Sequence, residues 1–86
     1  MDKRLNEIIK EKLNEKNLSI REFAARTRMS EAYISCLLEG TGKFIPYYVA
    51  KKLYKVFPEY PIETWEQICK EEYDIRKQEN NSSHHL

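Results

Sequence analysis

The sequence predicts an all-α domain of five helices without a β-sheet. Apolar residues recur at helical spacing in several separate stretches, and Ser and Gly residues stand where helices begin and end. The chain has two glycines and three prolines among its 86 residues, too few for the many turns of an all-β fold. This length allows one small domain, which is expected over residues 1–79, with a polar, disordered tail over 80–86.

The first helix is expected over residues 3–16, where apolar residues at helical spacing alternate with Lys, Glu and Asn. Its inward face consists of Leu5, Ile8, Ile9 and Leu13. A second helix is expected over residues 20–27, because Ser19 and Glu22 have the spacing of a capping box. A third is expected over residues 31–39, with Ser30 as its N-cap and Gly40 as its stop.

The second and third helices are separated by very few residues. Only Arg28 and Met29 stand between Thr27 and the cap at Ser30, and so short a connection makes the two helices cross steeply, as in a helix-turn-helix. Ala24 is small enough to permit the close crossing. The apolar residues expected to fill the core beneath it are Phe23, Ile34 and Leu37.

Two further helices are expected after this pair. Pro46 suits the first turn of the fourth helix. The inward face of that helix is predicted to hold Val49, Ala50, Leu53, Tyr54 and Phe57. The fifth helix, about residues 62–79, carries Trp65, Ile68 and Cys69 on one side, with Tyr73 a further candidate. This apolar stripe is expected to be buried, either against the first and fourth helices or against a second subunit.

The net charge of +1 conceals an uneven distribution. Residues 18–57 carry seven basic and three acidic residues, whereas residues 58–86 carry three basic and seven acidic ones. This predicts either two surfaces with different partners or two ordinary solvated faces. The acidic run of Glu71, Glu72 and Asp74 is interpreted in the same two ways, as a solvated face or as a protein-binding one.

Several classes of protein are not favoured by the sequence. No uncharged stretch exceeds seven residues, so no membrane span is expected. Cys36 and Cys69 lack the spacing of metal ligands, and they are expected to be reduced thiols in a cytosolic protein. No residue pair resembles a nucleophile with its base and no Gly-rich loop is present, so neither an enzyme, a metal site nor a cofactor is expected.

The run LSIREFAARTRMSEAYISCLLEG, followed by a proline-started amphipathic helix, resembles the Cro/lambda-repressor (XRE) helix-turn-helix family over roughly residues 5–57. The resemblance implies a five-helix, lambda-repressor-like domain with an additional C-terminal helix. It also implies that the helix over 31–39 lies in the DNA major groove. The base-reading positions implied are Ser30, Glu31, Ala32, Tyr33 and Cys36, and the phosphate-contacting ones are Arg21, Arg28, Lys43 and Tyr47.

Individual residues of this region have second interpretations. The residues at base-reading positions could instead be the exposed face of a structural helix, and Cys36 could be a half-buried, inert thiol. Of the neighbouring Tyr47 and Tyr48, one is expected to pack and the other to be exposed. Arg28 stands where the family usually has a glycine with positive φ, so we expect a left-handed backbone conformation there.

The later part of the chain resembles a narrower group. GKFIPYYVAKKLYKVF and ETWEQICKEEYDI are similar to HigA-type antitoxins, in which a helix with a tryptophan and a Tyr-Asp pair follows the DNA-binding domain. Trp65 and the pair Tyr73-Asp74 carry this similarity. Trp65 itself is expected in the core or at a dimer contact. The resemblance implies a homodimeric repressor that also binds a small basic, mRNA-cleaving toxin.

The expected function is therefore sequence-specific binding of double-stranded DNA by a transcriptional repressor. The expected location is the cytoplasm, near the nucleoid, in a bacterial or phage-encoded setting. In the antitoxin version of this function, the chain is the antitoxin of a HigBA-type toxin–antitoxin pair. One alternative is a phage- or plasmid-type XRE regulator without a toxin. Another is an interaction module that keeps the fold but has lost DNA binding, which the family's missing Gln at Ile20 and the acidic Glu31 and Glu39 favour.

Overall fold

The computed structural model describes residues 3–40 and 45–82, with side chains described as far as residue 78. This part of the chain contains five helices and no strand, which confirms the predicted all-α class. The helices are α1 (Leu5–Glu15), α2 (Ile20–Thr27), α3 (Glu31–Glu39), α4 (Tyr48–Val56) and α5 (Ile62–Ser82). Within the described ranges, no helix is both long enough and apolar enough to cross a bilayer.

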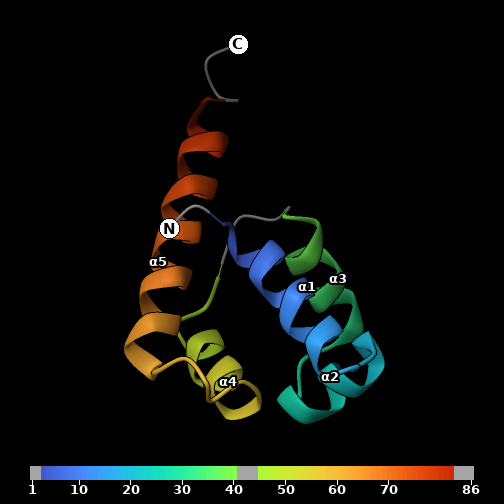
Figure 1. Ribbon diagram of the computed structural model, residues 1–86. Coiled ribbons are helices and arrows are strands. Elements are labelled where there is room, and N and C mark those ends of the chain that lie inside the picture. Colours follow the sequence, from blue (N-terminus) through green and yellow to red (C-terminus); the bar gives the residue numbers. More distant parts are fainter. Residues whose placement is uncertain (1–2, 41–44, 83–86) are drawn as a thin grey trace.

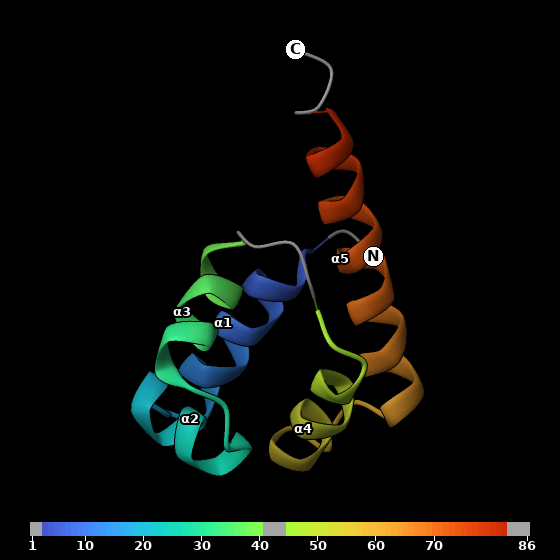
Figure 2. The same cartoon turned by 180° about the vertical axis from the view of Figure 1, so that it is seen from behind.

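The helices form two groups that pack against each other. α1, α2 and α3 lie together on one side of the molecule, and α4 and α5 lie together on the other (Figure 1). α4 joins the groups because it packs on both α2 and α5, while α1 contacts α3 and α5. The view from behind shows the same arrangement, with the C-terminal half of α5 extending beyond the other helices (Figure 2).

Local hydrogen bonds explain where α2 and α3 begin. The Ser19 hydroxyl accepts from the Glu22 amide at 3.1 Å, and the Glu22 carboxylate accepts from the Ser19 amide at 3.3 Å, as a capping box requires. The Ser30 hydroxyl accepts from the Tyr33 amide at 3.1 Å. Gly40, with φ of 74°, ends α3 in a left-handed conformation. The expected bounds of both helices are confirmed.

The connection between α2 and α3 has the backbone that the sequence predicted. Arg28 ends α2 with φ of 57° and ψ of 32°, in the left-handed region. A Cβ atom is unfavourable there, and a residue other than glycine costs about 1 kcal/mol. Met29, the residue after Arg28, is buried in the core and anchors the short connection there.

Aromatic side chains from three parts of the chain meet in the core. The ring of Phe23 stacks on Phe57 with centroids 5.7 Å apart, and Phe57 lies 6.1 Å from Trp65. The Trp65 indole nitrogen donates to the Phe57 carbonyl at 3.0 Å, and no part of this side chain is exposed. Trp65 therefore packs inside its own chain. Of the two positions expected for the apolar stripe of α5, against helices of the same chain or against a second subunit, Trp65 takes the first.

Several details differ from the sequence expectations. α1 begins at Leu5 rather than at residue 3, and α5 continues to Ser82, three residues into the segment expected to be a disordered tail. Tyr54, which is expected to face inward, is 40% exposed, and Tyr73, a further candidate for the apolar stripe, is 38% exposed. The core beside them is already filled by Leu53, Phe57 and Trp65, which have no exposed surface.

Glu72 is the clearest departure, because it is buried rather than part of a solvated face. Its carboxylate accepts from Arg76 Nε at 2.8 Å, from Arg4 Nε at 3.1 Å and from the Leu5 backbone amide at 3.3 Å. Arg76 is also buried and donates to the Leu37 carbonyl at 3.4 Å. Burial alone would raise the pKa of Glu72, but the two arginines outweigh it and hold the pKa below its usual 4.5.

Candidate functional site

The exposed face of α3 carries most of the residues expected to read bases. Ser30, Glu31, Ala32 and Cys36 are exposed. The opposite face of the helix, made of Ile34, Leu37 and Leu38, is buried in the core. α3 thus presents short polar and apolar side chains to solvent, together with two acidic residues and no basic one.

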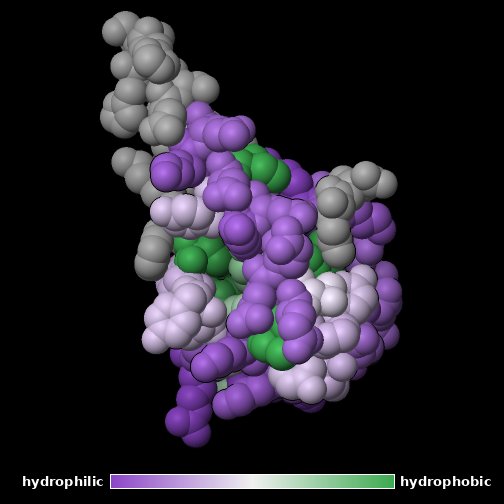
Figure 3. Space-filling model, turned by 90° about the vertical axis from the view of Figure 1, so that its left-hand side faces the viewer, coloured by the Kyte–Doolittle hydropathy of each residue, from purple (hydrophilic) through white to green (hydrophobic). Residues whose placement is uncertain are grey.

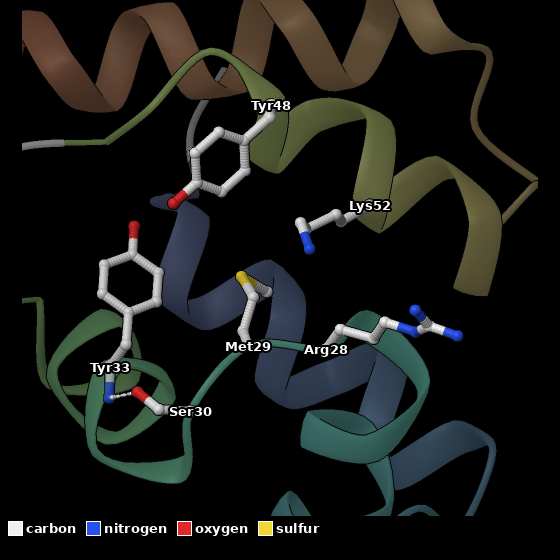
Figure 4. A pocket seen from close by; sticks show the side chains of 6 residues that line it. All are labelled: Arg28, Met29, Ser30, Tyr33, Tyr48 and Lys52. Carbon is white, nitrogen blue, oxygen red and sulfur yellow. Dashed lines mark hydrogen bonds between the residues drawn. The ribbon is translucent and has the colours of Figure 1, made fainter.

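Tyr33 lies differently from the other four residues. Its side chain is half-buried and turns from α3 toward α4, where its hydroxyl and that of Tyr48 point toward each other (Figure 4). The hydroxyl oxygen is buried and has no hydrogen-bond partner in the described part of the chain. Burial, together with the neighbouring Tyr48, raises the pKa of Tyr33. Tyr33 therefore stays protonated at neutral pH as a hydrogen-bond donor.

The residues expected to contact phosphates do not form one cluster. Arg21 is exposed in the first turn of α2, and Arg28 is exposed at the connection to α3. Tyr47 is 86% exposed just before α4. Its ring meets Tyr48 edge-on at 6.2 Å, and Tyr48 is itself 44% exposed, so neither tyrosine is buried as the sequence predicted for one of them. Lys43 lies outside the described residues.

A hollow surface between the α2–α3 connection and α4 brings Arg28 together with four basic residues that were not among the expected site residues, Arg26, Lys51, Lys52 and Lys55. It consists of two cavities of about 550 and 290 Å³, which share Arg28, Tyr48 and Lys52. We call their combined lining the basic trough. Its residues are Arg26, Thr27, Arg28, Met29, Ser30, Tyr33, Tyr48, Lys51, Lys52 and Lys55. None of the described residues that line it is acidic.

One lysine of the basic trough is held in place by the fold. Lys52 Nζ donates to the Thr27 carbonyl at 2.6 Å, at the end of α2 where the helix dipole favours a cation. The same ammonium lies 5.5 Å from the centre of the Tyr48 ring. Lys52 thereby joins α4 to α2 and fixes the width of the trough. Figure 4 shows Met29 between Tyr33 and Arg28, below Lys52.

The other basic side chains of the trough differ from Lys52 in being exposed and in lacking a described acidic partner. Arg26, Arg28, Lys51 and Lys55 are exposed, and none of them forms an ion pair with another residue that the structure describes. Elsewhere in the molecule lysines do pair. Lys12 and Lys16 both contact Glu59, at 3.2 and 3.4 Å. The positive charge of residues 18–57 is therefore concentrated at this surface. The i, i+4 spacing of Lys51 and Lys55 is the signal that could have indicated it.

A second hollow, of about 470 Å³, lies between α4 and α5. Tyr47 and Tyr73 line it at the surface, and Ile45, Ala50 and Cys69 line it more deeply. The side of the molecule that α4 and α5 form is mostly hydrophilic, and its apolar colours occur in separate patches (Figure 3). The hollow is therefore a small apolar site on a charged surface.

The thiols and acidic residues form no reactive centre in the described ranges. Cys36 and Cys69 do not form a disulfide bond. Burial raises the pKa of Cys69 to about 12, so this thiol stays protonated and unreactive. No group of three or more His, Cys, Asp or Glu side chains gathers as a metal site within residues 3–40 and 45–78.

Comparisons with protein families, curated proteins and solved structures found no match for this chain. The resemblance to the XRE family consequently rests on the residues quoted for it.

Proposed function

We propose that this chain is a DNA-binding transcriptional repressor that reads double-stranded DNA with the exposed face of α3. The observation that carries the proposal is the position of the basic trough beside that face, with Ser30 belonging to both. Specific recognition needs side chains that reach base edges and cations that neutralise phosphates. The two sets of residues lie next to each other here.

The exposed residues of α3 suit direct reading of bases. Glu31 can accept from the N4 amino group of cytosine, Ser30 can pair with several bases, and Ala32 can contact the methyl group of thymine. An α-helix fits the width of the major groove. Because α3 itself carries Glu31 and Glu39 and no cation, phosphate attraction must come from outside the helix. The basic trough supplies it.

A repressor of this size acts most effectively as a homodimer. One short helix contacts only a few base pairs, whereas two copies related by a two-fold axis read half-sites about one helical turn apart. We therefore propose a cytoplasmic homodimer bound to a two-fold symmetric operator, as a helix-turn-helix regulator.

Selection from randomised duplexes, followed by binding measurements, tests this proposal. The intact chain should enrich one sequence. Glu31→Ala should change the preferred base at one position of each half-site, while Glu39→Ala, at the far end of α3, should leave the preference unchanged. Arg21→Ala should weaken binding to all duplexes alike and lower the salt slope by about one. Failure to enrich any sequence would contradict the proposal.

The hollow between α4 and α5 favours a second candidate function, the binding of a partner protein as in an antitoxin. Its exposed Tyr47 and Tyr73 are the type of aromatic residue that anchors protein interfaces. The exposed acidic residues Glu63, Glu66 and Asp74 on α5 would attract a basic partner.

Co-expression with the neighbouring reading frame tests this second function, if that frame encodes a small basic, ribonuclease-like protein. Co-purification that Tyr73→Ala abolishes would support the antitoxin form, and independent purification would contradict it.

A further inference from the structure

The Tyr33 hydroxyl is a donor that the described fold leaves unused. Its oxygen is buried, yet no described residue accepts from it or donates to it. A buried hydroxyl without a partner destabilises a protein, because it has lost its hydrogen bonds to water. The Tyr33 side chain lines the larger cavity of the basic trough, and its hydroxyl points toward that of Tyr48, which is 44% exposed (Figure 4). An acceptor oxygen that enters the cavity and turns the Tyr48 ring aside would satisfy the Tyr33 hydroxyl.

The charges of the basic trough indicate which kind of acceptor that is. Five basic side chains line the trough without an acidic one, so they repel each other in the free protein. By contrast, Lys3, Lys12 and Lys16 pair with carboxylates, namely those of Glu11, Glu15 and Glu59. A polyanion that offers oxygen atoms would satisfy the hydroxyl and relieve the repulsion. The phosphodiester backbone of a nucleic acid has both properties.

We propose that the basic trough holds the phosphate backbone of the bound DNA, and that the Tyr33 hydroxyl donates a hydrogen bond to one of its phosphate oxygens. This inference rests on the proposed function and deepens it. It moves Tyr33 from the base-reading residues to the backbone-contacting ones, which position the protein without reading sequence. It also makes Arg26, Arg28, Lys51 and Lys55 the main counter-charges to the phosphates.

The shared position of Ser30 explains how one duplex reaches both surfaces. Ser30 caps the start of α3 and also lines the trough. A duplex whose bases meet Ser30 and Glu31 therefore has its flanking backbone beside Arg28, at the middle of the trough. Lys52, anchored on the Thr27 carbonyl, keeps the two walls of the trough in place for it.

Tyr33→Phe is the sharpest test, because it removes only the hydroxyl. Affinity for every duplex should fall about tenfold, as expected for loss of a hydrogen bond to a charged group, and the preferred sequence should not change. The free chain should be at least as stable as the parent, since the hydroxyl has no described partner. The matched variant is Tyr54→Phe, at a 40% exposed tyrosine of α4, which should alter neither property. A changed sequence preference in Tyr33→Phe, or an unchanged affinity, would overturn the assignment.

The charges are tested by a matched pair of double variants. Lys51→Gln with Lys55→Gln should lower the salt slope of DNA binding by about two, because each lysine neutralises about one phosphate. Lys10→Gln with Lys77→Gln removes the same charge from exposed sites on α1 and α5 and should leave the slope unchanged. Equal losses in both double variants would overturn the trough as the phosphate site and indicate a general effect of net charge.

Failure of the trough and failure of the proposed function give different results. If the parent binds duplex DNA but Tyr33→Phe and the Lys51/Lys55 variant bind equally well, the trough proposal fails and DNA binding stands. If the parent binds no duplex, the DNA repressor fails and the backbone assignment fails with it. Titration with inorganic pyrophosphate then identifies the source of phosphate oxygen. Pyrophosphate binding that Tyr33→Phe weakens would show that the trough holds a small phosphate-bearing ligand instead.

Discussion

Arg28 combines an unfavourable backbone conformation with a charge in the basic trough, and the two roles can be separated. Arg28→Gly should raise the free energy of unfolding by about 0.4–1 kcal/mol, because glycine adopts the left-handed conformation without strain. Arg28→Ala removes the same charge but keeps a Cβ atom, so it should give no such gain. Both variants should lose DNA affinity to the same extent. Chemical denaturation and binding titrations measure these quantities, and a less stable Arg28→Gly variant would contradict the account.

Single residues also mark the limit of what the sequence could reveal. The left-handed Arg28 could be predicted from the resemblance, because the XRE family usually has a glycine with positive φ at this position. The orientation of Tyr33 could not, because it depends on Tyr48 and on the groove between α3 and α4. Glu72 could not be placed either. Its partner Arg4 stands at the other end of the chain, and a glutamate in an acidic run, with Arg76 four residues later, is equally typical of a solvated helix face.

At the scale of elements, Glu72 joins α5 to the start of α1. Glu72→Gln should lower the free energy of unfolding at neutral pH by about 3 kcal/mol, because it removes the charge of the buried carboxylate that pairs with Arg4 and Arg76. Glu66→Gln, at an exposed site of the same helix, should have little effect. Thermal or urea unfolding of the two variants measures the difference, and equal stabilities would contradict the role given to Glu72.

The same ion pair predicts a dependence on pH. The pKa of Glu72 is lower in the folded chain than its usual 4.5, so its contribution to stability is complete above that value. The contribution is lost as the pH falls through the lower folded pKa. The stability difference between parent and Glu72→Gln should therefore shrink as the pH is lowered below 4.5. A difference that stays constant in acid would show that the carboxylate charge is not what stabilises the contact.

Trp65 makes α5 part of the core rather than an appendage. Trp65→Ala should lower the free energy of unfolding by about 3 kcal/mol or more, because it empties a fully buried site and leaves the Phe57 carbonyl without its donor. Deletion of residues 60–86 removes the same side chain and should destabilise the remaining helices. Urea titrations followed by circular dichroism measure both, and a truncated chain as stable as the parent would contradict this packing.

The individual helices were more predictable than the contacts between them. Caps such as Ser19, Ser30 and Gly40 act within a few residues, so the bounds of α2 and α3 follow from local sequence. The end of α5 did not follow, because the polar run after residue 79 carries no stop signal of that kind. The basic trough is built from the end of α2 and the outer side of α4, and only packing brings those together.

For the whole molecule, the charges separate onto two surfaces. The trough concentrates unpaired cations beside α3, whereas most acidic residues of the last segment lie on α5 or are paired within the fold. A duplex approaching α3 therefore meets positive potential, and the acidic side of α5 should face away from it. This arrangement is the physical basis of the proposed repressor.

Salt dependence of duplex binding by the intact chain tests this central claim most directly. Fluorescence anisotropy with a labelled duplex, titrated between about 50 and 200 mM salt, gives the slope of log affinity against log salt concentration. Arg21 and the four cations of the trough that have no described acidic partner predict a slope of about −4.5 for each protomer, since each phosphate neutralised contributes about −0.9. An affinity that does not change with salt, or no binding at the lowest concentration, would contradict the account.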